Sequence, residues 1–412
     1  MKTCLSDFAI AGGRPVFCEP LLVGRPGIPD RQAFLRRVSG ILDSGHLTNG
    51  GPLVGEFEQR LQDYLGVRHA IAVCNGTAAL QVMAMAAELS GEVIVPSMTF
   101  IATAHALQWM GLTPIFADID EHTHTLNPVS VEQCVTSRTS AILAVHLWGN
   151  PCDARSLQMI ADRHHLKLLF DASHAFGCRT ANSRIGNFGH AEAFSFHATK
   201  VMHAFEGGAV VTNHAEIAER CRLMRNFGIT GLCQIDSLGI NAKMNELSAA
   251  AGLTSLENLP EVIRHNQRNL SEYRREFQDL PGLTITIPET EEDRNAQYVV
   301  ARVAEGQFGL NRDQLLTVLR AEGVLARAYF VPGCHHAPPY AGNPKHTPVP
   351  LPVTDSLLHD VIQFPSGVSV DDSRIRRIGA LLSSIRLHAE ELREVAGSST
   401  TSVPQTIRRG AA

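Results

Sequence analysis

Lys200 is the residue whose surroundings in this sequence most clearly suggest chemistry. It lies in the stretch FSFHATKVMHAFEGGAV, residues 194–210, between an apolar run and a second apolar run that follows two glycines. An ammonium group is costly to bury, so a lysine in a turn between two buried strands is rarely simple surface charge. Such a lysine shifts its pKa readily and can form a Schiff base with a carbonyl compound. For a lone lysine, a place in a surface loop is the commoner explanation.

A second candidate site is the run Asn75-Gly76-Thr77-Ala78, which lies between a predicted strand and the start of a predicted helix. Glycine lets the backbone approach a ligand closely, and the free amides and dipole of a helix N-terminus favour a phosphate. A glycine turn followed by a threonine cap explains the same residues without any ligand. The run by itself leaves both interpretations open.

The third candidate is Asp171 in the run FDASHAFG, at the end of a predicted buried strand. A carboxylate there is either a helix cap or the partner of a fixed positive charge. Pyridoxal phosphate needs such a partner, because protonation of its ring nitrogen makes the ring an electron sink. His174 follows three residues later and could reach the ring hydroxyl, although for this residue alone a structural histidine is the commoner explanation.

These three features come together if the strands that carry them are parallel, because ligands of open parallel sheets bind beyond the carboxyl ends of the strands. The sequence lacks the motifs that are typical of several other kinds of active site. The sequence has no H-E-x-x-H, and its 19 histidines show no ligand spacing, so we expect no metal site. It also lacks G-x-S-x-G, G-x-G-x-x-G and G-x-x-x-x-G-K-[ST], which disfavours a serine hydrolase, a dinucleotide site and a P-loop.

The elements that must position these residues alternate between helix and strand, which predicts βαβ units and a mostly parallel sheet covered on both faces. After about residue 252 the pattern changes to a long polar helix at 256–280, β runs at 283–287, 296–303 and 324–330, and helices at 313–322 and 372–395. That pattern indicates a smaller α+β domain. We therefore expect a wrapping segment at 1–50, a large domain at 51–255, a small C-terminal domain at 256–396 and a disordered tail at 397–412.

Composition excludes several classes of protein. The net charge of −5, without a long basic run, argues against a nucleic-acid partner. No apolar stretch is long enough for a membrane helix, and the N-terminus does not read as a secretory signal. Nine cysteines without a C-x-x-C pair suggest free thiols in a reducing compartment. We expect a cytoplasmic protein.

The chain resembles the DegT/DnrJ/EryC1/StrS family of sugar aminotransferases from about residue 12 to residue 386. The motifs that carry the resemblance occur in the family's order: LTNGGPLVGEFE, VCNGTAAL, IVPSMTFIATAHAL, VHLWGNPCD, FDASHAFG, FSFHATK, FEGGAVVTN, RNFGITG, GINAKMNELSAAAGL and LPVTD. These enzymes are fold-type-I pyridoxal-phosphate enzymes. The resemblance therefore implies an aspartate-aminotransferase-like large domain and pyridoxal 5'-phosphate as the cofactor.

The resemblance also implies a role for each matching residue. Lys200 matches the lysine that forms the Schiff base with the cofactor, and Asp171 matches the carboxylate at its ring nitrogen. Asn241 matches an asparagine that reaches the cofactor phosphate of the neighbouring subunit, which implies a homodimer with shared active sites. The other cofactor contacts implied are His174 beside the ring hydroxyl, Phe100 on the ring face, and Gly76, Thr77 and Ser195 around the phosphate. For Phe100, a core position is the alternative.

The sequence departs from the family pattern at two places. The run YFVPGCHHAPPY resembles a substrate-side motif P-x-H-x-x-P-x-Y, but one extra residue separates Pro332 from His335. His335 and Tyr340 are nevertheless the candidate sugar contacts. Lys243 stands where the family has an arginine near Asn241.

The resemblance implies transfer of an amino group from glutamate to a nucleotide-linked keto-deoxysugar, since Lys200 is present where related dehydratases have histidine. The runs FHATK and FEGG are most similar to the branch that aminates carbon 4 of dTDP-4-keto-6-deoxyglucose, in antibiotic or cell-surface sugar biosynthesis. A carbon-3 sugar or aminocyclitol aminotransferase is the nearest alternative. A pyridoxamine-phosphate-dependent dehydratase and a non-catalytic cofactor-binding regulator are alternatives of other classes.

Overall fold

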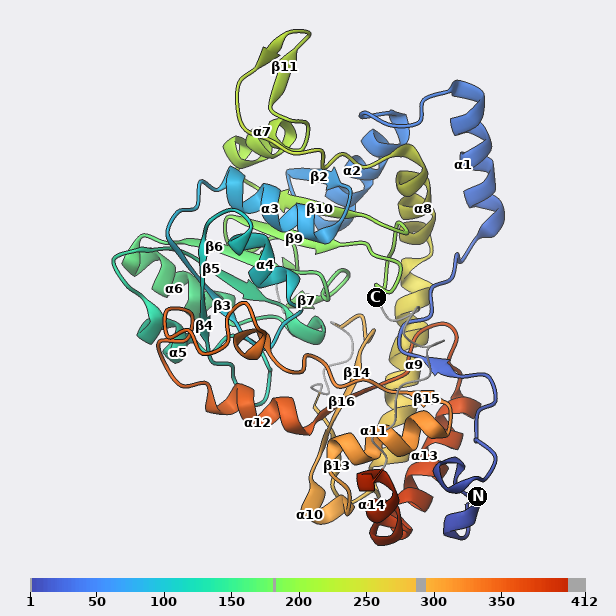
Figure 1. Ribbon diagram of the computed structural model, residues 1–412. Coiled ribbons are helices and arrows are strands. Elements are labelled where there is room, and N and C mark those ends of the chain that lie inside the picture. Colours follow the sequence, from blue (N-terminus) through green and yellow to red (C-terminus); the bar gives the residue numbers. More distant parts are fainter. Residues whose placement is uncertain (1, 181–182, 287–293, 399–412) are drawn as a thin grey trace.

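A seven-stranded sheet forms the centre of the larger part of the molecule (Figure 1). The computed structural model describes residues 2–180, 183–286 and 294–398. Across the sheet the strands are β2 (His69–Val73), β10 (Gly208–Thr212), β9 (Ala191–Ser195), β6 (Lys167–Asp171), β5 (Thr139–Val145), β3 (Glu92–Pro96) and β4 (Thr113–Ala117). All run parallel except β10, which is antiparallel to both of its neighbours. The predicted mostly parallel sheet is confirmed.

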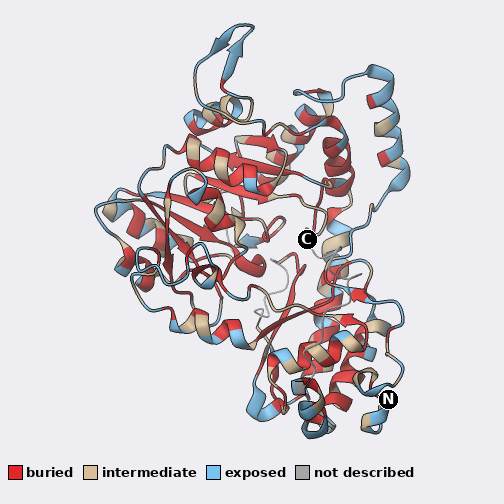
Figure 2. Ribbon diagram, in the orientation of Figure 1, coloured by how far each residue is buried: buried red, intermediate tan, exposed pale blue. Residues whose placement is uncertain are grey.

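Helices cover both faces of this sheet, because successive residues of a strand point to opposite sides. In β2, Ile71 and Val73 pack into one hydrophobic cluster, and Ala70 and Ala72 pack into another. The buried strands lie between exposed outer helix faces in Figure 2. The helices on the first face are α3 (Gly76–Ala86), α4 (Ala102–Gln108) and α7 (Ala215–Met224), and those on the second are α2 (Pro52–Leu65), α5 (Pro128–Cys134), α6 (Ala154–His164) and α8 (Glu246–Glu257).

The smaller part of the molecule is built on a three-stranded antiparallel sheet, β13 (Leu283–Ile285), β14 (Val299–Val303) and β16 (Val361–Phe364). Its hydrophobic cluster joins the strands to the long helix at the lower right of Figure 1 and to the C-terminal helices. These helices are α9 (Leu259–Phe277), α10 (Glu305–Phe308), α11 (Arg312–Ala321), α13 (Asp372–Leu387) and α14 (Ala389–Ser398), and α12 (Pro352–Asp360) lies beside the large sheet.

The first residues of the chain pack against this smaller part. Phe8 and Phe17 belong to its hydrophobic cluster. The buried carboxylate of Glu322 accepts hydrogen bonds from the amides of Ala9 (2.7 Å) and Val16 (2.8 Å). The elements of this segment are η1 (Leu5–Asp7), η2 (Ala9–Ala11), β1 (Leu21–Leu22) and α1 (Arg31–Ser44). Strand β1 pairs in parallel with β15 (Val324–Leu325), and α1 packs on α8.

Three predicted elements differ from the structure. The predicted long helix at 256–280 is two helices, since α8 ends at Glu257 and α9 starts at Leu259 with Pro260 in its first turn. The predicted strand at 324–330 is a strand only over β15, followed by an isolated bridge from Arg327 to Gln363. The predicted last helix is interrupted at His388, between α13 and α14. Residue 287 and nearly all of the predicted tail lie outside the described residues.

Two short hairpins leave the large sheet. One is β7 (Arg179–Thr180) with β8 (Ser183–Arg184), and the other is β11 (Ile229–Gly231) with β12 (Gln234–Ile235), which projects at the top of Figure 1. Within the described ranges, no helix has the length and apolar character that crossing a membrane requires.

Candidate active site

A cavity of about 680 Å³ lies at the carboxyl ends of the large sheet's strands, between the two parts of the molecule. That is the place where ligands bind to open parallel sheets. The larger part contributes the ends of β2, β5, β6 and β9, and the smaller part contributes residues near β14, β15 and β16. All eight predicted cofactor contacts line this cavity: Gly76, Thr77, Phe100, Asp171, His174, Ser195, Lys200 and Asn241.

The start of α3 forms one wall of the cavity. The Asn75 side chain caps the helix by accepting a hydrogen bond from the amide of Ala78 at 2.8 Å. Among the described residues, the amides of Gly76 and Thr77 have no protein acceptor, so they remain for a ligand. A Cβ at Gly76 would lie 2.7 Å from the Cβ of Ser195, closer than packed carbon atoms come. Glycine is therefore required at the closest approach of the helix to β9.

Asp171 is a buried carboxylate at the end of β6. Its Oδ2 accepts a hydrogen bond from the Thr103 hydroxyl at 2.8 Å, and its Oδ1 accepts one from the amide of Ser173 at 3.1 Å. These two bonds hold the orientation of the carboxyl group. The cavity therefore contains a fixed acidic side chain.

His174 is buried among aromatic rings at the cavity. Its ring stacks on Trp148 at a centroid distance of 5.7 Å and on Phe330 at 5.9 Å. Burial and the nearby Lys200 amine lower the pKa of His174 well below its usual value. Its Nδ1 accepts a hydrogen bond from the Trp148 amide at 3.4 Å. The neutral ring therefore carries its proton on Nε2, where it can be donated.

Lys200 lies in the turn between β9 and β10, as the sequence predicted. Burial lowers the pKa of its amine from 10.5 to about 8, and the nearby Asp171 carboxylate opposes this shift. The residue as a whole is partly exposed, since its side chain borders the cavity. The amine also donates a hydrogen bond to the Tyr298 hydroxyl at 3.4 Å. A substantial fraction of this amine is neutral near pH 8 and can act as a base or nucleophile.

Phe100 lies on the cavity wall with 57% of its surface exposed, so the alternative of a core position is wrong. Its ring meets Phe330 edge-on at 6.5 Å. Asn241 is exposed at the cavity, where its side-chain oxygen accepts a hydrogen bond from Lys243 at 2.7 Å. The role of Asn241 in a neighbouring subunit's site stays a prediction.

His335 and Tyr340 do not reach the cavity. His335 is buried, with its Nδ1 2.5 Å from the Ser97 hydroxyl and its Nε2 3.0 Å from Asp355 Oδ1. Tyr340 is 1% exposed and packs edge-on against Phe116. The predicted sugar contacts of these two residues have no support in this geometry, because both side chains are buried and neither lines the cavity.

The sequence did not point to several cavity residues. Tyr298 contacts Lys200, and Thr103 holds Asp171. Arg327 and Gln363 bring polar groups from the smaller part. The only signal for Tyr298 was its place in a predicted β run. No local pattern separates such a residue from a core residue.

Comparison with known proteins defines the class. The model of the DegT/DnrJ/EryC1/StrS aminotransferase family matches residues 29–383. The chain therefore belongs to this family, and it is an aminotransferase. The predicted family and fold class are confirmed.

Individual relatives cover most of the chain. A dTDP-4-amino-4,6-dideoxy-D-glucose transaminase of Shigella dysenteriae is 37% identical over 314 residues, covering 76% of this chain and 85% of the relative. The enzyme of the same name from Escherichia coli is 33% identical over 363 residues, covering 87% and 97%. The solved structure of DesI, described as in the presence of its TDP-sugar product, matches with a TM-score of 0.90 and 51% identity, covering 96% and 99%.

Proposed function

We propose that this chain is a pyridoxal 5'-phosphate-dependent aminotransferase that moves the amino group of glutamate to carbon 4 of dTDP-4-keto-6-deoxyglucose. One observation carries the proposal. The Lys200 amine, the Asp171 carboxylate and the α3 N-terminus with its two free amides line a single cavity. An amine, an acid and an anion cradle are the three groups that this cofactor requires from a protein.

The residues present fit this cofactor. The amides of Gly76 and Thr77 and the hydroxyl of Ser195 would hold the phosphate, in a space that a Cβ at position 76 would fill. Asp171 would pair with the ring nitrogen and His174 with the ring hydroxyl. The exposed Phe100 would cover a ring face, which is where an aromatic side chain gains most from a flat ligand. When bound, the cofactor supplies an aldehyde that carries the amino group and a protonated ring that withdraws electrons.

The chain's own side chains provide the proton transfers. With a pKa of about 8, the Lys200 amine can take a proton from the donor's α-carbon and later return one to the keto carbon of the acceptor. Two hydrogen bonds orient the Asp171 carboxyl group, which would pair with the cofactor's ring nitrogen and favour its protonated form. Glutamate leaves as 2-oxoglutarate, and the keto sugar becomes an amino sugar.

The substrate assignment is supported by the relatives. The curated relatives from Shigella and Escherichia are named for a 4-amino-4,6-dideoxyglucose, and DesI is described with a TDP-sugar product. A 33% identical relative from Streptomyces venezuelae is named as a dTDP-3-amino-3,4,6-trideoxy-α-D-glucose transaminase, so carbon 3 is the alternative position. Arg327 and Gln363 line the cavity on the side of the smaller part. The arginine could pair with the negative charge of the substrate, and the glutamine amide could form hydrogen bonds with its hydroxyl groups.

The test is an assay of the purified protein with pyridoxal phosphate, glutamate and dTDP-linked 4-keto and 3-keto sugars. We expect 2-oxoglutarate and a 4-amino sugar in equal amounts, with the 4-keto sugar preferred. A deoxygenated sugar without amine transfer would identify a dehydratase. Bound cofactor without turnover of any nucleotide sugar would identify a regulator.

Variants connect this activity to the site. Lys200→Ala should lose more than about a thousandfold in rate, because it removes the group that transfers the protons. Asp171→Ala should lose rate and retain the cofactor more weakly. Lys167→Ala is the matched control, since Lys167 is exposed at the start of β6 on the same sheet. If Lys200→Ala turned over like Lys167→Ala, the assigned role of Lys200 would be wrong.

We also propose that the protein is a homodimer. The hairpin β11–β12 projects from the larger part, and its residues are exposed (Figures 1 and 2). The hairpin and its flanks include five exposed large apolar residues. These are Phe227, Ile229, Leu232, Ile235 and Leu238. Contiguous exposed apolar residues mark interaction sites. The hairpin leads directly to Asn241 at the cavity, which agrees with a site shared between subunits.

Light scattering on a sizing column tests the dimer. The double variant Leu232→Asp/Leu238→Asp should run as a monomer, because it places two charges in the apolar surface. Leu387→Asp, at an equally exposed leucine of α13, is the control and should run like the parent protein. A double variant that remains dimeric would place the interface elsewhere.

A further inference from the structure

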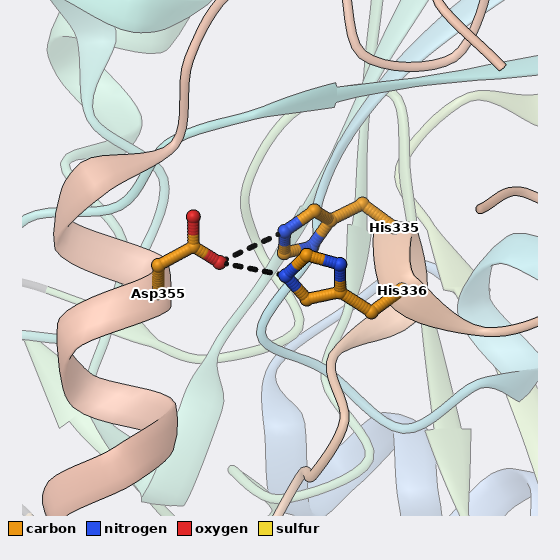
Figure 3. A group of neighbouring side chains, drawn as sticks. All are labelled: His335, His336 and Asp355. Carbon is orange, nitrogen blue, oxygen red and sulfur yellow. Dashed lines mark hydrogen bonds and ion pairs between the residues drawn. The ribbon is translucent and has the colours of Figure 1, made fainter. Parts of the chain in front are cut away.

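Two histidines and an aspartate converge outside the cavity, on a short turn and the neighbouring helix (Figure 3). The turn is η5 (Cys334–His336), and it faces Asp355 of α12. The Nε2 atoms of His335 and His336 each lie 3.0 Å from the same oxygen, Oδ1 of Asp355. Among the described residues, this is the one group in which three histidine, cysteine or acidic side chains bring ligand atoms within 4.8 Å of one another.

The backbone forces the two adjacent rings into this unusual arrangement. Gly333 precedes the turn with φ +86°, and a Cβ there would lie 2.6 Å from the Leu358 side chain. The tight turn that follows sets the imidazole rings of His335 and His336 side by side, with centroids 3.8 Å apart and planes tilted by 39°. Both Nε2 atoms therefore point at one spot. Histidine spacing in the sequence did not reveal this group, because the third member is 19 residues further along the chain than His336.

One of the rings is held in place from behind. The Nδ1 of His335 lies 2.5 Å from the hydroxyl of Ser97, and that hydroxyl also accepts a hydrogen bond from the His335 amide at 3.1 Å. A hydrogen bond to the second ring nitrogen is the usual support of a metal-binding histidine, because it fixes the orientation and the tautomer. Ser97 provides such support here, at the end of β3.

The opposite side of the group is open to water. The side chains of His336 and Asp355 are 54% and 47% exposed, whereas His335 is 7% exposed. Figure 3 shows the second carboxylate oxygen of Asp355 pointing away from both rings. A cation could therefore enter from solvent, and water could complete its coordination.

We propose that His335, His336 and Asp355 form a binding site for a divalent transition-metal ion of the zinc class. Two imidazole nitrogens and one carboxylate oxygen are ligands that Zn²⁺ prefers. Bonds of about 2.0–2.1 Å in a tetrahedral arrangement separate the ligand atoms by roughly 3.3–3.4 Å. The two separations of 3.0 Å need only a small side-chain movement to reach this value.

The site is separate from transamination, since none of its three side chains lines the cavity. Its effect would be structural. A bound ion would join η5 to α12 and, through Ser97, to the segment after β3 that carries Phe100. The competing explanation is a carboxylate that simply accepts two hydrogen bonds from two histidines.

The experiment uses the cofactor-loaded enzyme without a histidine tag, freed of metal with a chelator and desalted. Zn²⁺ is titrated by calorimetry. Co²⁺ is then added to the metal-free enzyme and its absorption spectrum recorded, because Co²⁺ with nitrogen and oxygen ligands lacks the intense near-ultraviolet bands of a thiolate complex. This distinction matters because Cys4, Cys18 and Cys233 are exposed.

The variants are His336→Ala and Asp355→Asn, which change exposed ligands and leave the buried His335 in place. His122→Ala is the control, at an exposed histidine outside the group. We expect one Zn²⁺ per chain, a Kd at least tenfold higher in both ligand variants, and parental values in the control. Transaminase activity and cofactor absorbance of the ligand variants should match those of the parent, which shows that they fold.

Three results would overturn the proposal. They are the absence of saturable Zn²⁺ binding, the same Kd in parent, His336→Ala and Asp355→Asn, and thiolate bands in the Co²⁺ spectrum. Each of them would mean that His335, His336 and Asp355 form a hydrogen-bonded cluster and not a metal site. None of them bears on the assigned roles of Lys200 and Asp171.

Discussion

Replacing Lys200 with methionine should make the cofactor-free protein more stable at neutral pH. The folded protein holds the amine where burial lowers its pKa to about 8, whereas the unfolded chain has the ordinary value of 10.5. At pH 7 the lysine is therefore charged in a place that disfavours the charge. Methionine has a similar length and no charge, and it fills such space well. Active-site residues commonly cost stability in this way.

The magnitude follows from the two pKa values. The difference between 10.5 and about 8 is about 2.5, which at about 1.4 kcal/mol for each pKa unit corresponds to roughly 3 kcal/mol. Because Lys200 is partly exposed to water, we expect about 1–3 kcal/mol. Between pH 8 and 10.5 the unfolded state binds more protons than the folded state, so the parent protein gains stability as the pH rises. The advantage of Lys200→Met is therefore full below pH 8 and absent above pH 10.5.

The assay is urea unfolding of the cofactor-free parent and variant at pH 7 and at several values up to pH 10.5, with equal m-values as the condition for comparison. Lys167→Met is the matched control, because Lys167 is exposed on β6 and should show no such pH dependence relative to the parent. A Lys200→Met variant that is less stable than the parent at pH 7, or that differs from it by a constant amount at all pH values, would refute the reasoning.

Two further variants test the surroundings of the lysine. Gly76→Ala places a Cβ 2.7 Å from the Cβ of Ser195, a strain of about 1–3 kcal/mol, and should weaken pyridoxal phosphate binding in a fluorescence titration by roughly 5- to 150-fold. Gly55→Ala in α2 is the control, since nothing lies within 4 Å of the new Cβ, and it should bind the cofactor normally. Equal affinity of the two variants would contradict the assignment of the phosphate site to the start of α3. Tyr298→Phe removes the acceptor 3.4 Å from the Lys200 amine, so the rise of stability with pH should begin about 0.5–1 pH unit lower, and an unchanged curve would contradict that contact.

The central sheet could be predicted because parallel strands buried on both faces are continuous apolar runs. Residues 93–95 and 141–145 are examples, and each is bounded by polar residues or proline. The break near Asn258 could also have been predicted, since Asn followed by Leu-Pro is typical of a helix start. The run at 324–330 reads as a strand in isolation, but only β15 forms a strand, with β1 some 300 residues earlier in the chain. Beyond β15, Arg327 makes an isolated bridge to Gln363.

The candidate site was predictable where its residues follow strands of the large sheet. Asp171 ends β6, and Gly76 opens the helix after β2, so strand order places them at one edge. Tyr298 and Arg327 could not be found in this way, because their presence in the cavity depends on how the smaller part packs against the larger. His335 was expected near the sugar from its motif alone, and the turn after Gly333 directs it to Ser97 instead.

The N-terminal segment has a consequence for biosynthesis. Phe8 and Phe17 pack against residues as distant as Ala396, and the amides of Ala9 and Val16 bind the carboxylate of Glu322. On the ribosome, Phe8 and Phe17 therefore emerge long before Glu322 and Ala396, with which their segment packs. The large sheet lies between them in the sequence and can assemble in the meantime, whereas the smaller part can close only after α14 has been synthesised.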